Sequence, residues 1–293
     1  MATLAPIAAT MPSRGPTAIL LRKLFGRKVV LVGGVVLVAM ALAALAAPWI
    51  TPYDPMALKV LDRLQSPRAA HWFGTDELGR DVFSRVVFGA RYSLMIGACV
   101  VVVSVMAGVL LGLFAGFFRR LDAPIMRVVD AMMSFPDILL AIALVAALGA
   151  SMTNVIIALS IVYTPRVARV VRASALVVRE LLFIEAARAL GVSTSRILFI
   201  HVLQNIASPI LVQATFIFAF AILAEAGLSF LGVGVPPAFP TWGTMIAASQ
   251  QYAHRAIWLP LFPGVAIVLA ALSLQMVGDS LRDLLDPKLR KTL

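Results

Sequence analysis

The segment Glu185-Ala186-Ala187-Arg188-Ala189-Leu190-Gly191 sets charged side chains beside a run of small ones. Leu182, Ala186 and Leu190 lie four residues apart, so they share one face of the helix that this region favours. The glycine is expected to end that helix in the left-handed conformation, and Ser193 to Ser195 can cap a new helix. The sequence therefore predicts a helix, a bend and a second helix. This unit is either a docking element or an amphipathic connector on a membrane surface. Docking is considered because small side chains let the surface of a partner approach the helix closely.

A second group of charged residues raises the question of a metal or carboxylate site. Asp76, Glu77 and Asp81 lie close together in a segment that begins as a turn and continues as a helix. Arg80 and Arg85 are within helical reach of these acids, and ion pairs at that spacing are common. Structural ion pairing is therefore the favoured interpretation.

The sequence lacks the residues that most catalytic mechanisms require. There is no glycine-rich phosphate loop, no Cys/His cluster and no Ser/His/Asp set gathered at one depth, and Cys99 is the single cysteine. Glu225 is the one carboxylate that comes near the middle of an apolar run, where an unpaired charge is costly. It either faces a polar path or gate or lies near an interface, and the flanking residues 224–232 favour the outer end of a span.

Composition identifies the class of protein. Of the 293 residues 61% are hydrophobic and 13% are charged, and the mean hydropathy is +0.97. Soluble domains are about 45–50% apolar and about 25% charged, so this chain is expected to be an integral membrane protein. The net charge of +11 comes from basic residues that border apolar runs, which indicates membrane topology and not nucleic-acid binding.

Hydropathy and charge predict six spans with both termini in the cytoplasm. The first is long enough to cross about 30 Å of hydrocarbon and is interpreted as an uncleaved span and not a signal peptide. The loop 166–205 holds six arginines and two glutamates, so it is placed in the cytoplasm, and Pro165 marks a kink or the exit of the fourth span. The predicted spans cover residues 29–47, 92–117, 135–148, 154–164, 206–231 and 258–277.

Two features of these spans predict local structure. The glycines of the second span (Gly97, Gly108, Gly112 and Gly116) are expected to let another membrane helix approach closely. Asp137 is expected at the inner interface, as a carboxylate in the first turn of the third span.

Four motifs together resemble a known family. Glu185-Ala186-Ala187, followed by Gly191 and by the apolar-x-Leu position near Val202 and Leu203, resembles the EAA loop of permeases in binding-protein-dependent ABC importers. The other blocks are Gly74-Thr75-Asp76-Glu77-Leu78-Gly79-Arg80-Asp81, Leu228-Ser229-Phe230-Leu231-Gly232 and Gly278-Asp279-Ser280-Leu281-Arg282-Asp283-Leu284-Leu285-Asp286-Pro287. Over about residues 29–290 the chain is similar to the second, C-type permease of the dipeptide, oligopeptide and nickel importer group.

The resemblance implies an all-α type I importer fold in a bacterial cytoplasmic (inner) membrane. It implies a heterodimer with a homologous permease, two ATPase subunits that bind ATP and magnesium, and an extracytoplasmic substrate-binding protein. The chain itself would be a non-catalytic transport subunit without a cofactor or metal. Glu185, Ala186, Ala187 and Gly191 would form the ATPase-coupling helix and its bend. Gln204 stands where the family usually has proline, and glutamine can continue a helix there.

This resemblance also divides the chain. Residues 1–28 would be a cytoplasmic tail, 29–90 the first span with an outer segment, 91–281 the transmembrane core with the coupling loop 166–205, and 282–293 a cytoplasmic tail. The outer segment 72–90 and the loop 233–257 are candidates for contact with the binding protein, for the outer gate, or for packing between the two permeases.

The substrate is the least determined part of this interpretation. Peptides are expected, and nickel, glutathione or another small solute on the same scaffold is the alternative. An ion-coupled secondary carrier or a membrane-embedded enzyme is a more distant alternative.

Overall fold

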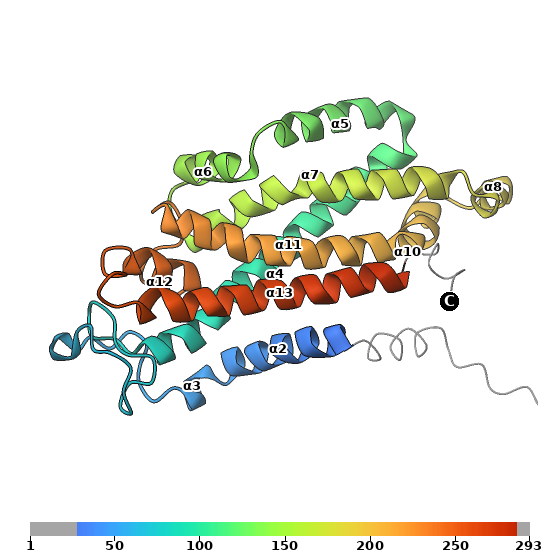
Figure 1. Ribbon diagram of the computed structural model, residues 1–293. Helices are drawn as coiled ribbons and strands as arrows, with labels where there is room; N and C mark the ends of the chain where they lie inside the picture. The colour runs from blue at the N-terminus through green and yellow to red at the C-terminus, as the bar shows by residue number, and fades with distance from the viewer. Residues whose placement is uncertain (1–27, 286–293) are drawn as a thin grey trace, which may run out of the picture.

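The computed structural model describes residues 28–285, so most of the two predicted tails, 1–28 and 282–293, lies outside the described residues, and residues 282–285 belong to the last helix. The described chain folds into helices, and the long connection over residues 51–81 contains only one short 3-10 helix (Figure 1). These are α2 (Lys28–Leu45), α3 (Ala47–Ile50), the 3-10 helix η1 (Val60–Asp62), α4 (Val82–Phe117), α5 (Arg119–Met133), α6 (Asp137–Leu148), α7 (Met152–Arg179), α8 (Leu182–Ala189), α9 (Thr194–Arg196), the π-helix η2 (Ile197–Val202), α10 (Leu203–Asn205), α11 (Ala207–Phe230), α12 (Trp242–Ser249) and α13 (Trp258–Leu285).

Five helices are long and apolar enough to cross a membrane: α2, α4, α7, α11 and α13. The pair α5 and α6 provides a sixth span if the two are counted together, although they are bent by 94°. Pro136 lies at this bend and has extended backbone dihedrals, since proline directs the chain out of a preceding helix. The number of spans predicted from hydropathy is therefore confirmed, with the third span broken.

The predicted end of the fourth span is wrong. The helix α7 continues through Pro165 to Arg179, so the connection to α8 begins at Glu180 and not at residue 166. A proline removes only one backbone donor, and Pro165 is buried against neighbouring helices that hold α7 in place. The arginines after Pro165 interrupt the apolar run, so hydropathy alone predicts a loop there.

Close packing of α4 on α7 supports this long helix. A methyl group built on Gly108 would lie 2.4 Å from Cβ of Val167, and one on Gly112 would lie 2.6 Å from the carbonyl oxygen of Ala168. A methyl group on Gly116 would likewise meet α7 at 2.9 Å. Side chains at these three positions would force the helices apart, which confirms the predicted use of the glycines.

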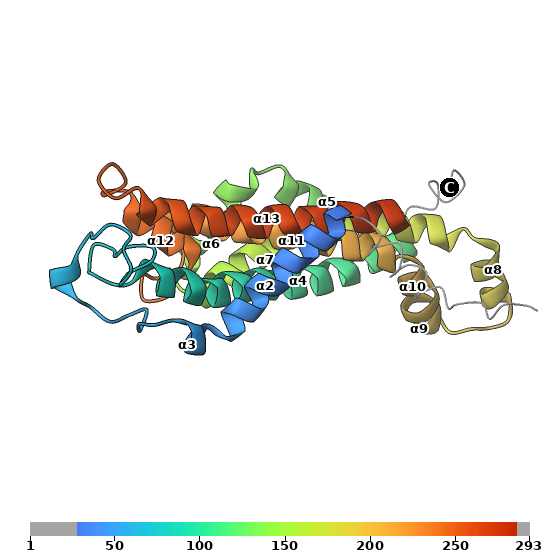
Figure 2. The same cartoon turned by 60° about the horizontal axis from the view of Figure 1, so that its bottom comes forward.

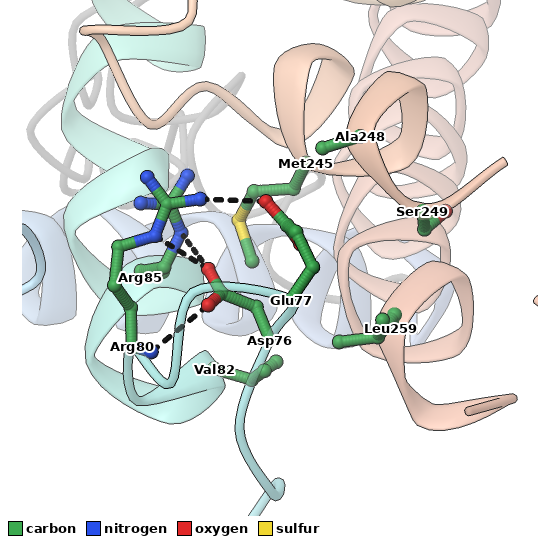
Figure 3. A pocket seen from close by; sticks show the side chains of 9 residues that line it. All are labelled: Asp76, Glu77, Arg80, Val82, Arg85, Met245, Ala248, Ser249 and Leu259. Atoms are coloured by element: carbon green, nitrogen blue, oxygen red, sulfur yellow. Dashed lines mark hydrogen bonds and ion pairs between the residues drawn. The ribbon is translucent and has the colours of Figure 1, made fainter. Parts of the chain in front are cut away.

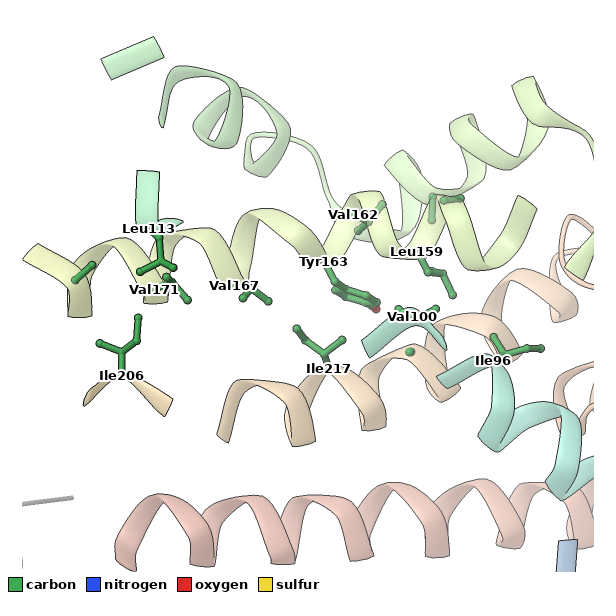
Figure 4. Packing of buried hydrophobic residues seen from close by; sticks show 14 of the residues in the cluster. Ile96, Val100, Leu113, Leu159, Val162, Tyr163, Val167, Val171, Ile206 and Ile217 are labelled. Atoms are coloured by element: carbon green, nitrogen blue, oxygen red, sulfur yellow. The ribbon is translucent and has the colours of Figure 1, made fainter. Parts of the chain in front are cut away.

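The interior of the bundle is filled by aliphatic side chains from α4, α7 and α11 (Figure 4). The long helices α2, α7, α11 and α13 run roughly side by side, and α4 crosses behind them (Figures 1 and 2). The segment before α4 and the short helix α12 lie at one end of the bundle, and α8, α9 and α10 lie at the other. The two groups of residues singled out in the sequence are thus separated by the length of the bundle.

Candidate coupling site and the polar sites of the bundle

The helix α8 contains the predicted docking segment and is held by one of its faces. Ile184 is completely buried, and it is the buried residue of this eight-residue helix. The guanidinium of Arg188 lies 5.0 Å from the ring centroid of Phe117, at the end of α4. Arg179, just before α8, donates through Nη1 to the carbonyl oxygen of Gly116 at 2.9 Å. Arg188 thus holds α8 against the end of α4, and the Arg179 hydrogen bond joins the ends of α4 and α7, the helix that precedes α8.

Gly191 ends α8 in the predicted way. Its φ is +74°, and its N–H donates to the carbonyl oxygen of Arg188 at 3.0 Å. The N–H of Val192 donates to the carbonyl oxygen of Ala187, also at 3.0 Å. This pair of hydrogen bonds is the Schellman arrangement, which requires a residue that tolerates the left-handed region.

The face of α8 that carries Leu182, Ala186 and Leu190 is exposed. Leu182 and Leu190 are 82% and 83% exposed, and Ala186 and Glu185 are exposed beside them. Large apolar side chains gathered on one rigid surface are typical of a surface that binds a partner. The sequence predicted which residues share this face, but it did not identify Ile184 as the anchor underneath.

The chain that follows Gly191 returns to the bundle as a nearly continuous helix. Ser193 occupies the predicted cap position, with extended backbone dihedrals but without a side-chain capping bond. Gln204 lies within α10, so the prediction that glutamine can continue a helix here is confirmed. The helical path is interrupted at Ile206, where φ is −104° and ψ is 8°, before α11 begins.

The acidic residues at the opposite end of the bundle form ion pairs (Figure 3). The Arg80 side chain donates to Asp76 at 2.6 Å and to Glu77 at 2.9 Å, and Arg85 lies 3.5 Å from Asp76. Arg85 also donates to the carbonyl oxygen of Pro55, so the cluster ties the segment before α4 to the start of that helix. The predicted structural pairing is confirmed for Asp76 and Glu77.

Asp81 has a different role from the one predicted. One carboxylate oxygen accepts from the backbone N–H of Ser84 at 2.8 Å and so caps α4. The other oxygen lies 2.8 Å from Nδ1 of His71, and both side chains are buried. The predicted pairing of Asp81 with an arginine is therefore wrong, because the carboxylate is already used at the helix N-terminus. The available sequence signal was an aspartate directly before an apolar helical run, which is a common N-cap residue.

Loop 233–257 is largely a packed element. It contains α12, whose Trp242 is buried and donates through Nε1 to the carbonyl oxygen of Val86 at 3.0 Å. The Trp242 backbone N–H donates to Ser93 at 3.1 Å. These bonds join α12 to α4, and contact of this loop with a binding protein remains a prediction.

Glu225 lies toward the C-terminal end of α11, the end predicted to be outer, and is only 1% exposed. Its Oε1 accepts from the hydroxyls of Ser229 at 2.9 Å and Thr241 at 2.8 Å. Within the described residues, Oε2 has no hydrogen-bond partner. The carboxylate therefore joins α11 to the start of α12, and its use in a path or gate remains a prediction.

Asp137 lies in the first turn of α6, as predicted, and its position at the inner interface remains a prediction. It forms an ion pair with Arg166, which is near the middle of the 28-residue α7. The helix α6 has only 12 residues, about 18 Å, and it ends next to the start of α7. Its first residue therefore reaches only halfway along α7.

A chain with five or six membrane-length helices in its described part has the architecture of a multi-pass membrane protein. Comparison with known families makes this specific. Residues 108–291 match the family described as binding-protein-dependent transport system inner membrane component, and residues 15–67 match the N-terminal TM domain of oligopeptide transport permease C. The chain belongs to the binding-protein-dependent transport system inner membrane component family.

Individual relatives agree with this assignment. A dipeptide transport system permease protein (DppC) of Alkalihalophilus pseudofirmus is 45% identical over 92% of this chain and 89% of the relative. A glutathione transport system permease protein (GsiD) of Pectobacterium atrosepticum is 40% identical over 99% of this chain and 97% of the relative. The chain is therefore a C-type ABC importer permease of the inner membrane, and it is a transport subunit and not an enzyme.

A solved structure supports the fold. The MetNI methionine ABC transporter, in inward-facing conformations, matches with a TM-score of 0.57 at 18% identity, over 70% of this chain and 97% of the other. This likeness confirms the predicted type I importer fold. Membership of the family implies partner subunits with ATPase activity and a substrate-binding protein.

Proposed function

We propose that this chain forms half of the translocation path of an ATP-driven peptide importer and receives one ATPase subunit on α8. The observation that carries the proposal is the construction of α8. Leu182 and Leu190 project from one face, and Ile184 and Arg188 hold the opposite face to the bundle. A helix anchored in this way transmits force from a bound partner instead of sliding.

The four residues that match the family motif lie on α8 or directly after it. Glu185 and Ala186 are exposed on α8, Ala187 accepts the hydrogen bond that closes the helix, and Gly191 makes the bend. We assign ATPase coupling to these four residues. The chain itself would bind no ATP, and the nucleotide and magnesium would be held by two ATPase subunits.

The other partners follow from the same proposal. The second half of the path would come from a homologous permease in a heterodimer, and an extracytoplasmic binding protein would deliver the solute. ATP binding would draw the ATPases together and move the coupling helices, closing the inner side of the path and opening the outer side. Such a switch requires that the ATPases bind the two conformations with different affinity.

Peptides are the proposed solute because relatives that align with most of this chain are named for dipeptide and glutathione transport. Glutathione is the second candidate, supported by the relative that aligns with 99% of this chain. Both solutes carry free ammonium and carboxylate groups.

The test is ATP-dependent uptake by the complete complex in proteoliposomes, with a radiolabelled dipeptide. We expect uptake with the unmodified chain and its loss with Glu185→Lys, which puts a reversed charge on the docking face. Asp279→Lys is the control, because Asp279 is also an exposed carboxylate but lies on α13. Uptake that survives Glu185→Lys, or that needs no ATPase subunit, would refute the proposal.

A further inference from the structure

Three arginines of α7 pair with three aspartates of α5 and α6. The arginines recur every three residues, so they follow one side of the helix. Each aspartate comes from a position 29 to 50 residues earlier in the chain. The pairs are Arg166 with Asp137, Arg169 with Asp130, and Arg172 with Asp122.

These pairs are not sealed inside the subunit. The Arg166 and Asp137 side chains are 34% and 39% exposed, at the middle of a helix long enough to cross a membrane. An ion pair that faces hydrocarbon is costly, and charged residues within a span almost always face the interior of an assembly or a water-filled cavity. This side of α7 and α6 is therefore expected to face the path and not lipid.

A groove adjoins the Asp137–Arg166 pair. It has a volume of about 250 Å³ and lies between α6, α7 and α11. Asp137 contributes to its lining, and the walls are otherwise mainly apolar, including Leu159 and Leu223. The guanidinium of Arg166 lies 5.7 Å from the ring of Tyr163 and 5.6 Å from that of Phe220, and both rings line the groove.

We propose that this groove and the Asp137–Arg166 pair bind the passing solute. They would select a short solute that has an ammonium group at one end, a carboxylate at the other and an apolar body between them. This inference rests on the proposed transport function and adds the groups of this chain that contact the solute.

The chemistry of the pair fits that solute class. A guanidinium can hold a carboxylate with two parallel hydrogen bonds, and an aspartate accepts hydrogen bonds from an ammonium group. The two side chains neutralise each other when no solute is present, so neither charge is left unpaired. An entering zwitterion supplies both opposite charges, and the apolar walls accommodate its body.

The neighbouring pair of Arg169 and Asp130 provides a matched control. It has the same two residue types one turn along α7, and its side chains are 49% and 60% exposed. Neither residue lines the groove. Neutralising this pair removes the same charges from the same face without changing the proposed site.

The experiment is photolabelling of the permease–ATPase complex in nanodiscs. The probe is the dipeptide alanyl-benzoylphenylalanine, compared with its N-acetylated and C-amidated forms. The binding protein is omitted so that its own selectivity does not contribute. We expect the free dipeptide to label this chain about tenfold more than either blocked form, on the order expected for a charge-assisted hydrogen bond.

The variants give separate results for the two ends of the solute. Asp137→Asn should abolish the preference for a free amino terminus and keep the preference for a free carboxylate, and Arg166→Gln should do the reverse. The variant with both Asp130→Asn and Arg169→Gln should keep both preferences. Co-purification of the ATPases confirms that each variant is assembled.

Two results would overturn the inference. One is equal labelling by the free and blocked dipeptides, and the other is loss of both preferences together in each single variant, as a purely structural pair would give. ATP-dependent uptake by the unmodified complex is measured in parallel. Uptake without selective labelling would refute this inference alone. Absence of uptake by the unmodified complex would refute the proposed function.

Discussion

Replacing Gly191 with alanine isolates the bend after α8. Its φ is +74°, and no atom lies within 4 Å of a methyl group built there, so alanine would cost only the unfavourable backbone conformation. That cost is roughly 1–2 kcal/mol, which favours unwinding of the helix end by a factor of about 5–30. Because α8 is the proposed docking helix, we expect uptake to fall several-fold while the protein remains in the membrane.

Proline at the same position has a larger effect. Its ring fixes φ near −65° and removes the N–H that donates to Arg188, so the Schellman arrangement cannot form. We expect Gly191→Pro to abolish uptake and to reduce the amount of ATPase that co-purifies with the permease.

Gly232 offers a matched control for this series. It has a φ of +79°, no atom lies within 4 Å of a methyl group built there, and it closes α11 with the same two hydrogen bonds. It lies at the opposite end of the bundle from α8. Gly232→Ala should therefore have the same local cost and leave ATPase binding unchanged. Equal loss of ATPase from Gly191→Ala and Gly232→Ala would refute the reasoning, and so would normal uptake with Gly191→Pro.

Three further substitutions test the packing described above. Gly108→Ala places a methyl group 2.4 Å from a valine of α7 and should lower the free energy of unfolding by about 1–3 kcal/mol, seen in thermal denaturation of the purified protein, whereas Gly34→Ala meets no atom within 4 Å and should not. Ile184→Ala removes the buried anchor of α8 and should cost about 2–5 kcal/mol in the same assay, but Leu182→Ala, at an exposed position, should leave stability unchanged and reduce ATPase co-purification. Asp76→Asn removes the carboxylate beside buried Arg85 and leaves Arg80 paired with Glu77 alone, so it should destabilise the outer segment by about 3–5 kcal/mol, measured by its rate of proteolysis in right-side-out vesicles. Unchanged stability of Gly108→Ala or Ile184→Ala, or unchanged proteolysis of Asp76→Asn, would contradict the corresponding packing argument.

The membrane spans could be predicted because an apolar run of about 20 residues has few alternatives. Their ends could not, because several helices extend into charged sequence. At the end of α7, Arg179 donates to the carbonyl oxygen of Gly116, and near the start of α4, Arg85 donates to that of Pro55. Tertiary partners thus stabilise helical turns that hydropathy assigns to loops.

The coupling segment was predictable to the extent that its structure is local. Gly191 acts through its own backbone conformation and through hydrogen bonds to residues on α8, all of which are close in sequence. The burial of Ile184 depends on helices that are distant in the chain, and neighbouring Leu182 has the same apolar character in the sequence. Only the fold distinguishes the anchoring side chain from the exposed one.

The ion pairs of α7 were missed for the same reason. Arg166 and Asp137 are 29 residues apart, and hydropathy placed the arginine in a loop and the aspartate at the inner interface. The three-residue recurrence of arginine from Arg166 to Arg172 was the one signal that these charges belong to a single helical face. That signal becomes useful only if the helix is allowed to continue through Pro165.

The continuity of α7 also links the two proposed sites. Its 28 residues extend about 42 Å, with Arg166 near the middle and α8 following the C-terminal end. The three ion pairs join α5 and α6 to α7, and the packed glycines of α4 hold the same helix from another side. If an ATPase subunit displaces α8, close-packed helices transmit that displacement instead of absorbing it. The groove beside Asp137 is therefore the place where movement of α8 would change contact with a solute, because the helices that line it are fixed to the one that α8 follows.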